Sequence, residues 1–491
     1  MSYLDPTGFL QLLISLILYI LLGPWTLCLV ATNELLRLLV SLRLRSKYGG
    51  KISLVPKGSE AIWAFKRPNR PRVSTVFLKL DKLITCERVK QTFNDIVFQA
   101  KSSNGEQVYS KLKKIFVVKY GYACWEESEE EFDMEEHVRS LPDNKVYSKS
   151  EINKLIDEWS YDMSEERPQW EFIIVPRFVE NAGDPETCLF ITRLFHAYMD
   201  GLCFTMLYEK YLTTGYTWYI NPFEFRIPFW KKFFWYMNAV AFGPYATLLL
   251  IITKTRKFWT EVPSNGSPPT TRYSWTKGMD ADMIRKIRKK MNNPSLSTIM
   301  VNAYVAAAKE ILPVGRLHDL LRVVELSAFL PYRNERPQNR FSGFYYLINS
   351  RQPDFERIKS TKKNYWKAIS GPWIPITNLL IRSVGRFPVW FHFLVVSGGP
   401  NSLVMNSIPV SKTKVIVMES GTMLEVFTFS ANPTDTGVQL LCASYANSVR
   451  ITGMVRSEYL SESEFEDIFV RIPDIIDEWA QKLADDEVEL V

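Results

Sequence analysis

Two long apolar runs dominate the hydrophobic pattern of the chain. The first, Phe9–Ala31, carries no charged residue and has about the length that crosses a bilayer. The second, Phe233–Thr253, lies mid-chain and is also uncharged. Gly23-Pro24 and Gly243-Pro244 interrupt these runs, so each is either a membrane helix or a hairpin held in one leaflet. A buried helix of a soluble core is the third alternative, mainly for the second run.

Basic residues around the two runs indicate an orientation. The only charged residue before the first run is Asp5, and the run is followed by Arg37, Arg43, Arg45 and Lys47. This bias places the rest of the chain on the cytosolic side. No basic segment precedes the run and no small-residue cleavage site follows it, which argues against a secretory signal. The second run has basic residues at both ends, which fits best if both ends are cytosolic.

Outside the runs, the pattern changes repeatedly between the period of strands and that of helices. Period-2 or short apolar segments predict strands at 74–81, 170–178, 186–195, 414–418, 423–430, 438–445 and 449–455. Helical spacing predicts helices at 87–101, 202–212, 297–312 and 462–487. A Pro-, Gly- and Ser-rich linker is expected at 262–271.

These elements define four parts of the chain. We expect a membrane anchor over 1–50, a mixed α/β half over 51–225, an apolar insert with its linker over 226–275, and a second mixed half over 276–491. A chain of 491 residues is also long enough for two domains with separate cores.

Composition narrows the possible partners. Hydrophobic residues make up 46% and aromatics 14% of the chain, which excludes a disordered protein. The net charge of +7 is spread without a Lys/Arg block, so no nucleic-acid partner is expected. A mild positive charge suits an anionic membrane surface or a phosphate-bearing ligand such as a coenzyme A ester. The six cysteines form no CxxC pair, which predicts reduced thiols and no zinc site.

The chemistry-bearing candidate is a corner between a predicted strand and a predicted helix. His196 ends the strand, and Asp200 and Gly201 follow it. An imidazole titrates near neutral pH, so His196 is the candidate general base. Asp200 either orients the imidazole or pairs with an arginine, and Gly201 permits a close approach. Such a pattern alone is more often structural than catalytic.

The chain has four histidines, and the other three are weaker candidates. His137 lies in an acidic stretch and is expected to be a surface or structural residue. His318 lies on a predicted helix or connecting loop. His392 lies in a third apolar patch, Val389–Val396, for which a buried strand is favoured over a lipid contact.

The segment FHAYMDG (Phe195–Gly201) resembles the HHxxxDG motif of the bifunctional wax ester synthase / acyl-CoA:diacylglycerol O-acyltransferase family. That family belongs to the coenzyme-A-dependent acyltransferases with the chloramphenicol acetyltransferase fold. Further stretches resemble the family in the same order, from about Val73 to the C-terminus: 132–142, 166–175, 406–411 and 437–455.

The resemblance implies a fold of two chloramphenicol acetyltransferase-like α/β domains with mixed sheets, a crossover between them and an active-site tunnel. It implies that His196 deprotonates an alcohol, which attacks the thioester of a long-chain acyl-CoA, with no metal or further cofactor. Asp200 would hold the loop through a salt bridge, and Gly201 would leave room beside the histidine. The acceptor would be a fatty alcohol or diacylglycerol, alongside membrane lipid. The expected location is the endoplasmic reticulum membrane facing the cytosol, or lipid droplets or the plasma membrane.

The sequence also departs from the family pattern. Phe195 replaces the first histidine of the doublet, and Met300-Val301 stands near the place of an Asn-Asp pair. The nearest candidates for an oxyanion donor are Ser297, Thr298 and Asn302. These departures motivate a second hypothesis, a catalytically inactive lipid-binding or droplet-surface protein on the same fold. A third keeps the enzyme with a sterol, another small alcohol or an amine as acceptor. The N-terminal anchor argues against a soluble condensation domain of peptide synthesis, which shares the motif.

Overall fold

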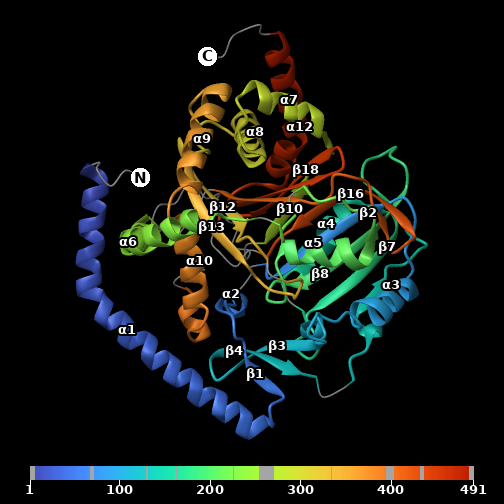
Figure 1. Ribbon diagram of the computed structural model, residues 1–491. Helices are drawn as coiled ribbons and strands as arrows, with labels where there is room; N and C mark the ends of the chain where they lie inside the picture. Colours follow the sequence, from blue (N-terminus) through green and yellow to red (C-terminus); the bar gives the residue numbers. More distant parts are fainter. Residues whose placement is uncertain are drawn as a thin grey trace.

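The computed structural model describes residues 6–66, 71–128, 131–161, 163–219, 221–224, 226–253, 270–332, 334–393, 403–431 and 436–485. Within them, two large mixed sheets lie side by side, each covered by helices, and a long helix extends along one side of the molecule (Figure 1).

The first sheet has eight strands and is built mainly from the N-terminal half. Its strands are β2 (Val73–Leu80), β5 (Val138–Ser140), β6 (Tyr147–Ser148), β7 (Trp170–Val179), β8 (Thr187–Phe195), β9 (Thr213–Thr214), β15 (Ile416–Val417) and β16 (Gly421–Phe429). All nine residues of β8 are buried, because helices or strands cover both faces of the sheet. The helices of this half are α2 (Gly58–Ala61), η1 (Ile62–Ala64), α3 (Cys86–Thr92), η2 (Phe93–Val97), η4 (Met134–His137), α4 (Lys149–Ser160), α5 (Gly201–Leu207) and η5 (Tyr208–Leu212).

The second sheet has seven strands and belongs to the C-terminal half. Its strands are β10 (Thr271–Trp275), β11 (Met279–Asp280), β12 (Leu320–Ala328), β13 (Phe341–Asn349), β14 (Leu403–Pro409), β17 (Val438–Tyr445) and β18 (Ser448–Arg456). Its apolar core is shared with helices that lie above the sheet in Figure 1. These are α7 (Ala281–Lys290), α8 (Leu296–Ile311), α9 (Asp354–Ile369) and α12 (Glu462–Asp485). The helices α10 (Trp373–Val384) and η6 (Val389–His392) follow α9.

A small third sheet joins the long helix to the rest. It contains β1 (Ile52–Leu54), β3 (Lys114–Lys119) and β4 (Tyr122–Glu127), with η3 (Ser110–Lys113) preceding β3.

The two halves are joined by a strand crossover. β16 comes from the C-terminal half but pairs antiparallel with β2 in the first sheet, with Phe427 opposite Phe77. The two rings stack at a centroid distance of 4.8 Å. This is the crossover that the family resemblance implies, and it closes the space between the sheets.

A buried ion network also connects the sheets. Arg450 on β18 donates to both carboxylate oxygens of Glu180, at 2.7 and 3.1 Å, and pairs with Glu425 on β16. Lys79 on β2 donates to the same Glu180 carboxylate at 2.9 Å. Burial acts to raise the pKa of Glu180, but the Arg450 guanidinium and the Lys79 ammonium outweigh it and hold that pKa at about 2. Each charge is therefore paired, which offsets the cost of removing it from water.

Most predicted elements are present with shifted ends. The strands predicted around 74–81, 170–178, 186–195, 423–430, 438–445 and 449–455 correspond to β2, β7, β8, β16, β17 and β18. The helix predicted at 87–101 is shorter, because α3 passes into a π-helical turn at Phe93–Val97. The strand predicted at 414–418 is reduced to Ile416–Val417. Most of the predicted linker falls on 254–269, outside the described residues.

Both apolar runs are continuous helices. The helix α1 (Pro6–Tyr48) passes through Gly23-Pro24, and α6 (Phe229–Thr253) passes through Gly243-Pro244. The hairpin alternative is therefore wrong for both. A proline inside a helix loses one i→i−4 hydrogen bond and crowds the preceding turn, yet both helices continue through it. By length and composition, α1 over Gly8–Tyr48 is the one helix in the described part of the chain that could cross a membrane.

The two helices pack against each other and leave apolar side chains exposed. Tyr19 on α1 donates its hydroxyl to the carbonyl oxygen of Val240 on α6 at 2.6 Å. On α6, Ala239 and Phe242 are buried, whereas Phe234 and Val240 are 58% and 57% exposed. The second run is thus not a fully buried core helix.

The Arg450–Glu180 pair yields a stability prediction. Glu180→Gln is expected to lower the free energy of unfolding by about 3–5 kcal/mol at pH 7, because it leaves the Arg450 charge buried and poorly paired. Since the pKa of Glu180 is depressed, its contribution is complete above about pH 4.5 and disappears as the pH falls toward 2. Chemical unfolding of the full chain in detergent, measured across this range, checks both statements.

Glu186→Gln serves as the matched control, since Glu186 pairs with Arg177 at the surface. Solvent screens that pair, so the variant is expected to unfold like the wild type. Equal destabilisation by the two substitutions would contradict the role given to the buried network.

Candidate active site

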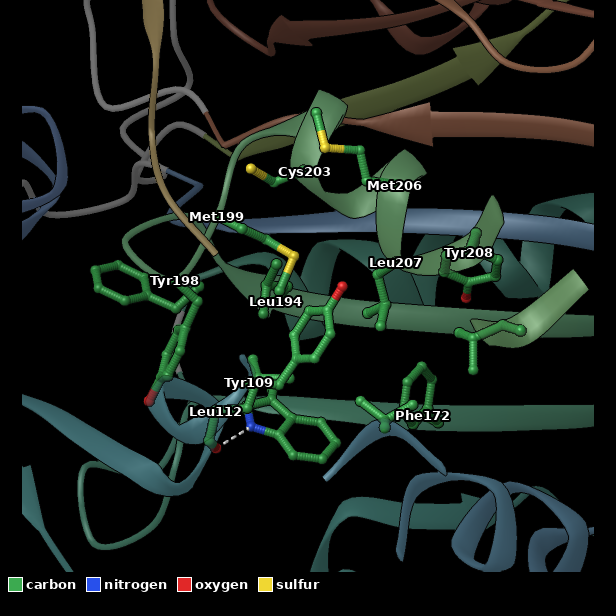
Figure 2. Packing of buried hydrophobic residues seen from close by; sticks show 14 of the residues in the cluster. Tyr109, Leu112, Phe172, Leu194, Tyr198, Met199, Cys203, Met206, Leu207 and Tyr208 are labelled. Carbon is green, nitrogen blue, oxygen red and sulfur yellow. Dashed lines mark hydrogen bonds between the residues drawn. The ribbon is translucent and has the colours of Figure 1, made fainter. Parts of the chain in front are cut away.

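The corner between β8 and α5 places His196 at the junction of the two halves. Asp200 is the N-cap of α5, and its Oδ1 accepts a hydrogen bond from Cys203 N at 2.9 Å. Ala197, Tyr198 and Met199 are buried within the corner. Figure 2 shows Cys203, Met206 and Leu207 of α5 in the same apolar cluster as Leu194 of β8. Packing of α5 on β8 therefore stabilises the corner between them.

Asn339 fixes the orientation of the His196 ring. Its Nδ2 donates to the backbone oxygens of His196 at 2.9 Å and Ala197 at 3.1 Å. Its Oδ1 therefore faces Nδ1 of His196, at 3.0 Å, and can only accept. It follows that Nδ1 carries the proton and Nε2 carries the lone pair. Asn339 comes from the clamp loop, which we define as residues 329–332 and 334–340, between β12 and β13.

Trp63 covers one face of the imidazole. The two rings are nearly parallel, with centroids 4.0 Å apart. Burial lowers the pKa of His196 below its usual value, and the nearby Asp200 charge opposes this only in part. The ring is thus neutral at neutral pH, which is the state a general base requires.

Asp200 is held by neutral donors and not by a cation. Its Oδ2 accepts hydrogen bonds from the hydroxyl of Tyr332 and from Arg340 N, the latter at 2.7 Å. No ion pair joins Asp200 to a residue in the described part of the chain. The salt bridge implied by the resemblance is therefore replaced by hydrogen bonds, because the clamp loop brings its backbone to the carboxylate.

A close contact favours glycine at position 201. A Cβ at this position would lie 3.1 Å from Cδ1 of Ile408 on β14. The glycine thus lets the corner approach the C-terminal half, and the space it leaves lies beside Ile408.

An apolar cavity lies beside His196 between the halves. It is lined by residues of β2, β8 and β16 of the first sheet, of α5, and of β14 and β17 of the second sheet. Apart from His196 and Asp200, its lining contains no lysine, arginine, aspartate, glutamate or histidine, and its one side-chain amide is that of Asn406. Such a lining suits an alkyl chain better than a charged group.

The three oxyanion candidates from the sequence are not at this cavity. Ser297, Thr298 and Asn302 are buried on α8 in the core of the C-terminal half. Asn302 donates to Thr298 O at 2.7 Å and accepts from Arg357 Nε at 3.0 Å. None of the three residues lines the cavity beside His196, and Asn302 is bound to Arg357 instead.

The other histidines have structural positions. His137 is buried against Trp170 and donates from Nδ1 to Trp170 O at 2.7 Å, and burial lowers its pKa to about 4. His392 lies in a 3-10 helix, so the strand predicted at Val389–Val396 is wrong as far as His392. His392 is buried, and its Nε2 donates to Phe387 O at 3.1 Å. His318 is exposed in the connection before β12.

Sequence reasoning missed Trp63, Tyr332 and Asn339. Each lies more than 100 residues from His196 in sequence, and none belongs to a recognisable spacing with it. Only the packing of the clamp loop and η1 on the corner reveals them.

Comparisons with known proteins support the fold. No protein-family model matches the sequence, and no curated protein sequence matches it. The structure is similar to the wax ester synthase/diacylglycerol acyltransferase from Marinobacter aquaeolei VT8, with 14% identity, a TM-score of 0.54, and coverage of 88% of this chain and 98% of that one.

Two other solved structures have the same architecture. The trichothecene 15-O-acetyltransferase from Fusarium sporotrichioides has 12% identity and a TM-score of 0.58, over 87% of this chain and 94% of that one. The first condensation domain of the calcium-dependent antibiotic synthetase has 11% identity and a TM-score of 0.54, over 89% and 98%. The chain thus has the two-domain, chloramphenicol acetyltransferase-like α/β fold that the resemblance implies.

The Asn339 contact yields a prediction about the pKa of His196. In Asn339→Asp a carboxylate faces Nδ1, which should raise that pKa above 6.5, whereas in the wild type it lies below. Diethyl pyrocarbonate reacts with neutral imidazole, so the pH dependence of His196 modification, followed by mass spectrometry, gives the pKa. The exposed His318 in the same digest is the internal control, and an unchanged His196 profile would refute the assignment.

Proposed function

We propose that the protein is a membrane-associated acyltransferase that transfers a long-chain acyl group from acyl-CoA to the hydroxyl of a lipidic alcohol. The observation that carries the proposal is a neutral imidazole with a free Nε2, held beside an apolar cavity between the two domains. The acceptor would be a fatty alcohol, giving a wax ester, or diacylglycerol, giving triacylglycerol.

The reaction would need one base and no covalent intermediate. Nε2 of His196 accepts the proton of the alcohol as its oxygen attacks the thioester carbonyl. The tetrahedral intermediate then collapses, the C–S bond breaks, and the coenzyme A thiolate takes the proton back from the imidazolium. The Nδ1–H···Oδ1 bond to Asn339 would stabilise the imidazolium formed in between.

The replacement of the family's first histidine does not weaken this proposal. Phe195 is buried and packs on Phe116, at a centroid distance of 5.2 Å, while the Arg72 guanidinium covers its ring. It does not line the cavity beside His196. The side chain at this position therefore supports the corner, and a phenyl ring can fill that role.

Exposed apolar helices support a membrane location. Both substrates would be amphiphiles, and α1 with α6 presents a large apolar surface beside the globular part (Figure 1). We infer residence at the endoplasmic reticulum membrane with the globular part in the cytosol, or at a lipid droplet or the plasma membrane.

The proposal predicts loss of activity on replacement of His196. Membranes that contain the wild type, supplied with labelled palmitoyl-CoA, hexadecanol and diacylglycerol, should form a neutral ester that identifies the acceptor. His196→Ala should lower the rate at least about 100-fold, since a positioned base contributes 10²–10⁴. His318→Ala should leave the rate unchanged, because His318 is exposed and away from the cavity.

The same assay decides between the alternatives. Activity only after addition of a sterol, a small alcohol or an amine would change the acceptor and keep the reaction. If no acceptor is esterified while labelled lipid co-purifies with the protein, the inactive lipid-binding alternative is favoured. Equal activity of His196→Ala and wild type would refute the role of the histidine.

A further inference from the structure

A second hollow lies on the far side of the clamp loop from the cavity beside His196. This basic groove, of about 1030 Å³, is bordered by the start of α6, the end of α10, α2 and the clamp loop. Its wall includes Tyr332 and Asn339, the residues that bind Asp200 and His196 on the other side. The basic groove and the corner that holds His196 are thus both in contact with the clamp loop, but the groove is cationic and the cavity beside His196 is apolar.

The groove carries a strong positive charge. Six basic residues line it: Lys57, Arg226, Lys232, Arg340, Arg382 and Arg386. No aspartate or glutamate is among its lining residues within the described part of the chain. Arg386 is compensated by Glu34 of α1, at 2.5 and 2.9 Å. By contrast, Arg226, Lys232 and Arg382 make no ion pair with any residue that the structure describes.

Concentrated like charges are unfavourable unless a counterion or ligand balances them. The rim of the groove exposes three of these cations. Arg226 lies just before α6, Lys232 lies on α6, and Arg382 lies on α10. A single guanidinium group presents its N–H donors as a planar fork, which binds phosphate oxygens through paired hydrogen bonds. The charge therefore points to an anionic ligand that bears phosphate.

The surroundings of the groove are those of a membrane surface. On α6, Phe229, Trp230, Phe233 and Phe234 are exposed next to Lys232. Trp235 and Tyr236 from the same turns line the groove itself. Aromatic residues beside lysines are typical of the level of the lipid headgroups. A ligand here can place its phosphate among the cations while its apolar tail stays in the bilayer.

We propose that the basic groove binds the phosphate of an amphiphile at the membrane surface. The phosphate could be supplied by an anionic phospholipid or by coenzyme A, since the recognised chemistry is the same. Bound phosphate would neutralise the rim and brace the clamp loop that positions His196 and Asp200. With a phospholipid as occupant this assignment goes beyond the proposed function, with coenzyme A as occupant it rests on that function, and in both cases it can be tested without turnover.

The test is equilibrium binding to the purified full-length protein in a nonionic detergent, by isothermal titration calorimetry. The probes are dioctanoyl phosphatidic acid, which is anionic, and dioctanoyl phosphatidylcholine, whose headgroup has no net charge. Phosphatidic acid should bind at least tenfold more tightly than phosphatidylcholine, and its affinity should fall as salt is raised. The combined variant Arg226→Glu, Lys232→Glu and Arg382→Glu should lose at least roughly tenfold in affinity.

The matched control reverses three exposed lysines on α7, which lies away from α6 in Figure 1: Lys286→Glu, Lys289→Glu and Lys290→Glu. It removes the same charge and should change the affinity less than twofold. If the groove variant does not fold, glutamine at the same three positions gives a milder version with an intermediate loss. Equal affinity for the two lipids, or equal losses in groove and control variants, would overturn the proposal.

Two further measurements distinguish a lipid headgroup from coenzyme A as the source of the phosphate, and the groove proposal from the proposed acyl transfer. Competition by free coenzyme A for the phosphatidic acid would identify a coenzyme A phosphate as an occupant, and its failure would identify a lipid headgroup. His196→Ala should bind phosphatidic acid like the wild type. Binding of phosphatidic acid by this variant, which lacks the proposed base, therefore shows a failure of the groove proposal separately from a failure of the proposed acyl transfer.

Discussion

The pairing of β16 with β2 is the constraint on which the rest of the structure depends. A strand from residues 421–429 completes a sheet that begins at residue 73, so neither sheet is finished until the chain has nearly ended. Because β16 is also next to the second sheet, its position brings β14 and Ile408 against Gly201. The Arg450–Glu180 hydrogen bonds then connect β18 of the second sheet to the end of β7 in the first sheet, and they hold the two sheets in their relative positions. The cavity exists only as a result of this closure.

The candidate base depends on contacts from distant parts of the chain. The β8–α5 turn supplies His196, but Trp63 and Asn339 decide how exposed, how basic and in which tautomer its ring is held. Asp200 binds the same clamp loop through Tyr332 and Arg340. Asp200 thus holds the clamp loop in place through hydrogen bonds, and Asn339 of that loop orients the His196 ring. Such an arrangement couples the geometry of the base to anything that moves the clamp loop.

The cavity beside His196 and the basic groove beside the clamp loop differ in polarity for a physical reason. Toward β2 and β14 the space is lined by apolar side chains, where a charge would be costly. Toward α6 and α10 it is open and lined by cations, where an anion is favoured. An amphiphilic molecule likewise combines a charged head with an apolar alkyl chain. The apolar surface of α1 and α6 borders the cationic side, so an apolar and a cationic surface lie next to each other.

The sequence by itself determined the local features. Period-2 and period-3.6 patterns identified β2, β7, β8, α8 and α12, because these elements bury one face or both faces against a core. The apolar runs were visible from composition, and His196 stood out as a scarce titratable group at a strand end. Only the tertiary structure decided that the Gly-Pro pairs lie within helices, that Asp200 binds neutral donors, and that Asn302 faces Arg357. These outcomes depend on contacts between residues far apart in sequence, and such contacts leave no periodic signal in the chain.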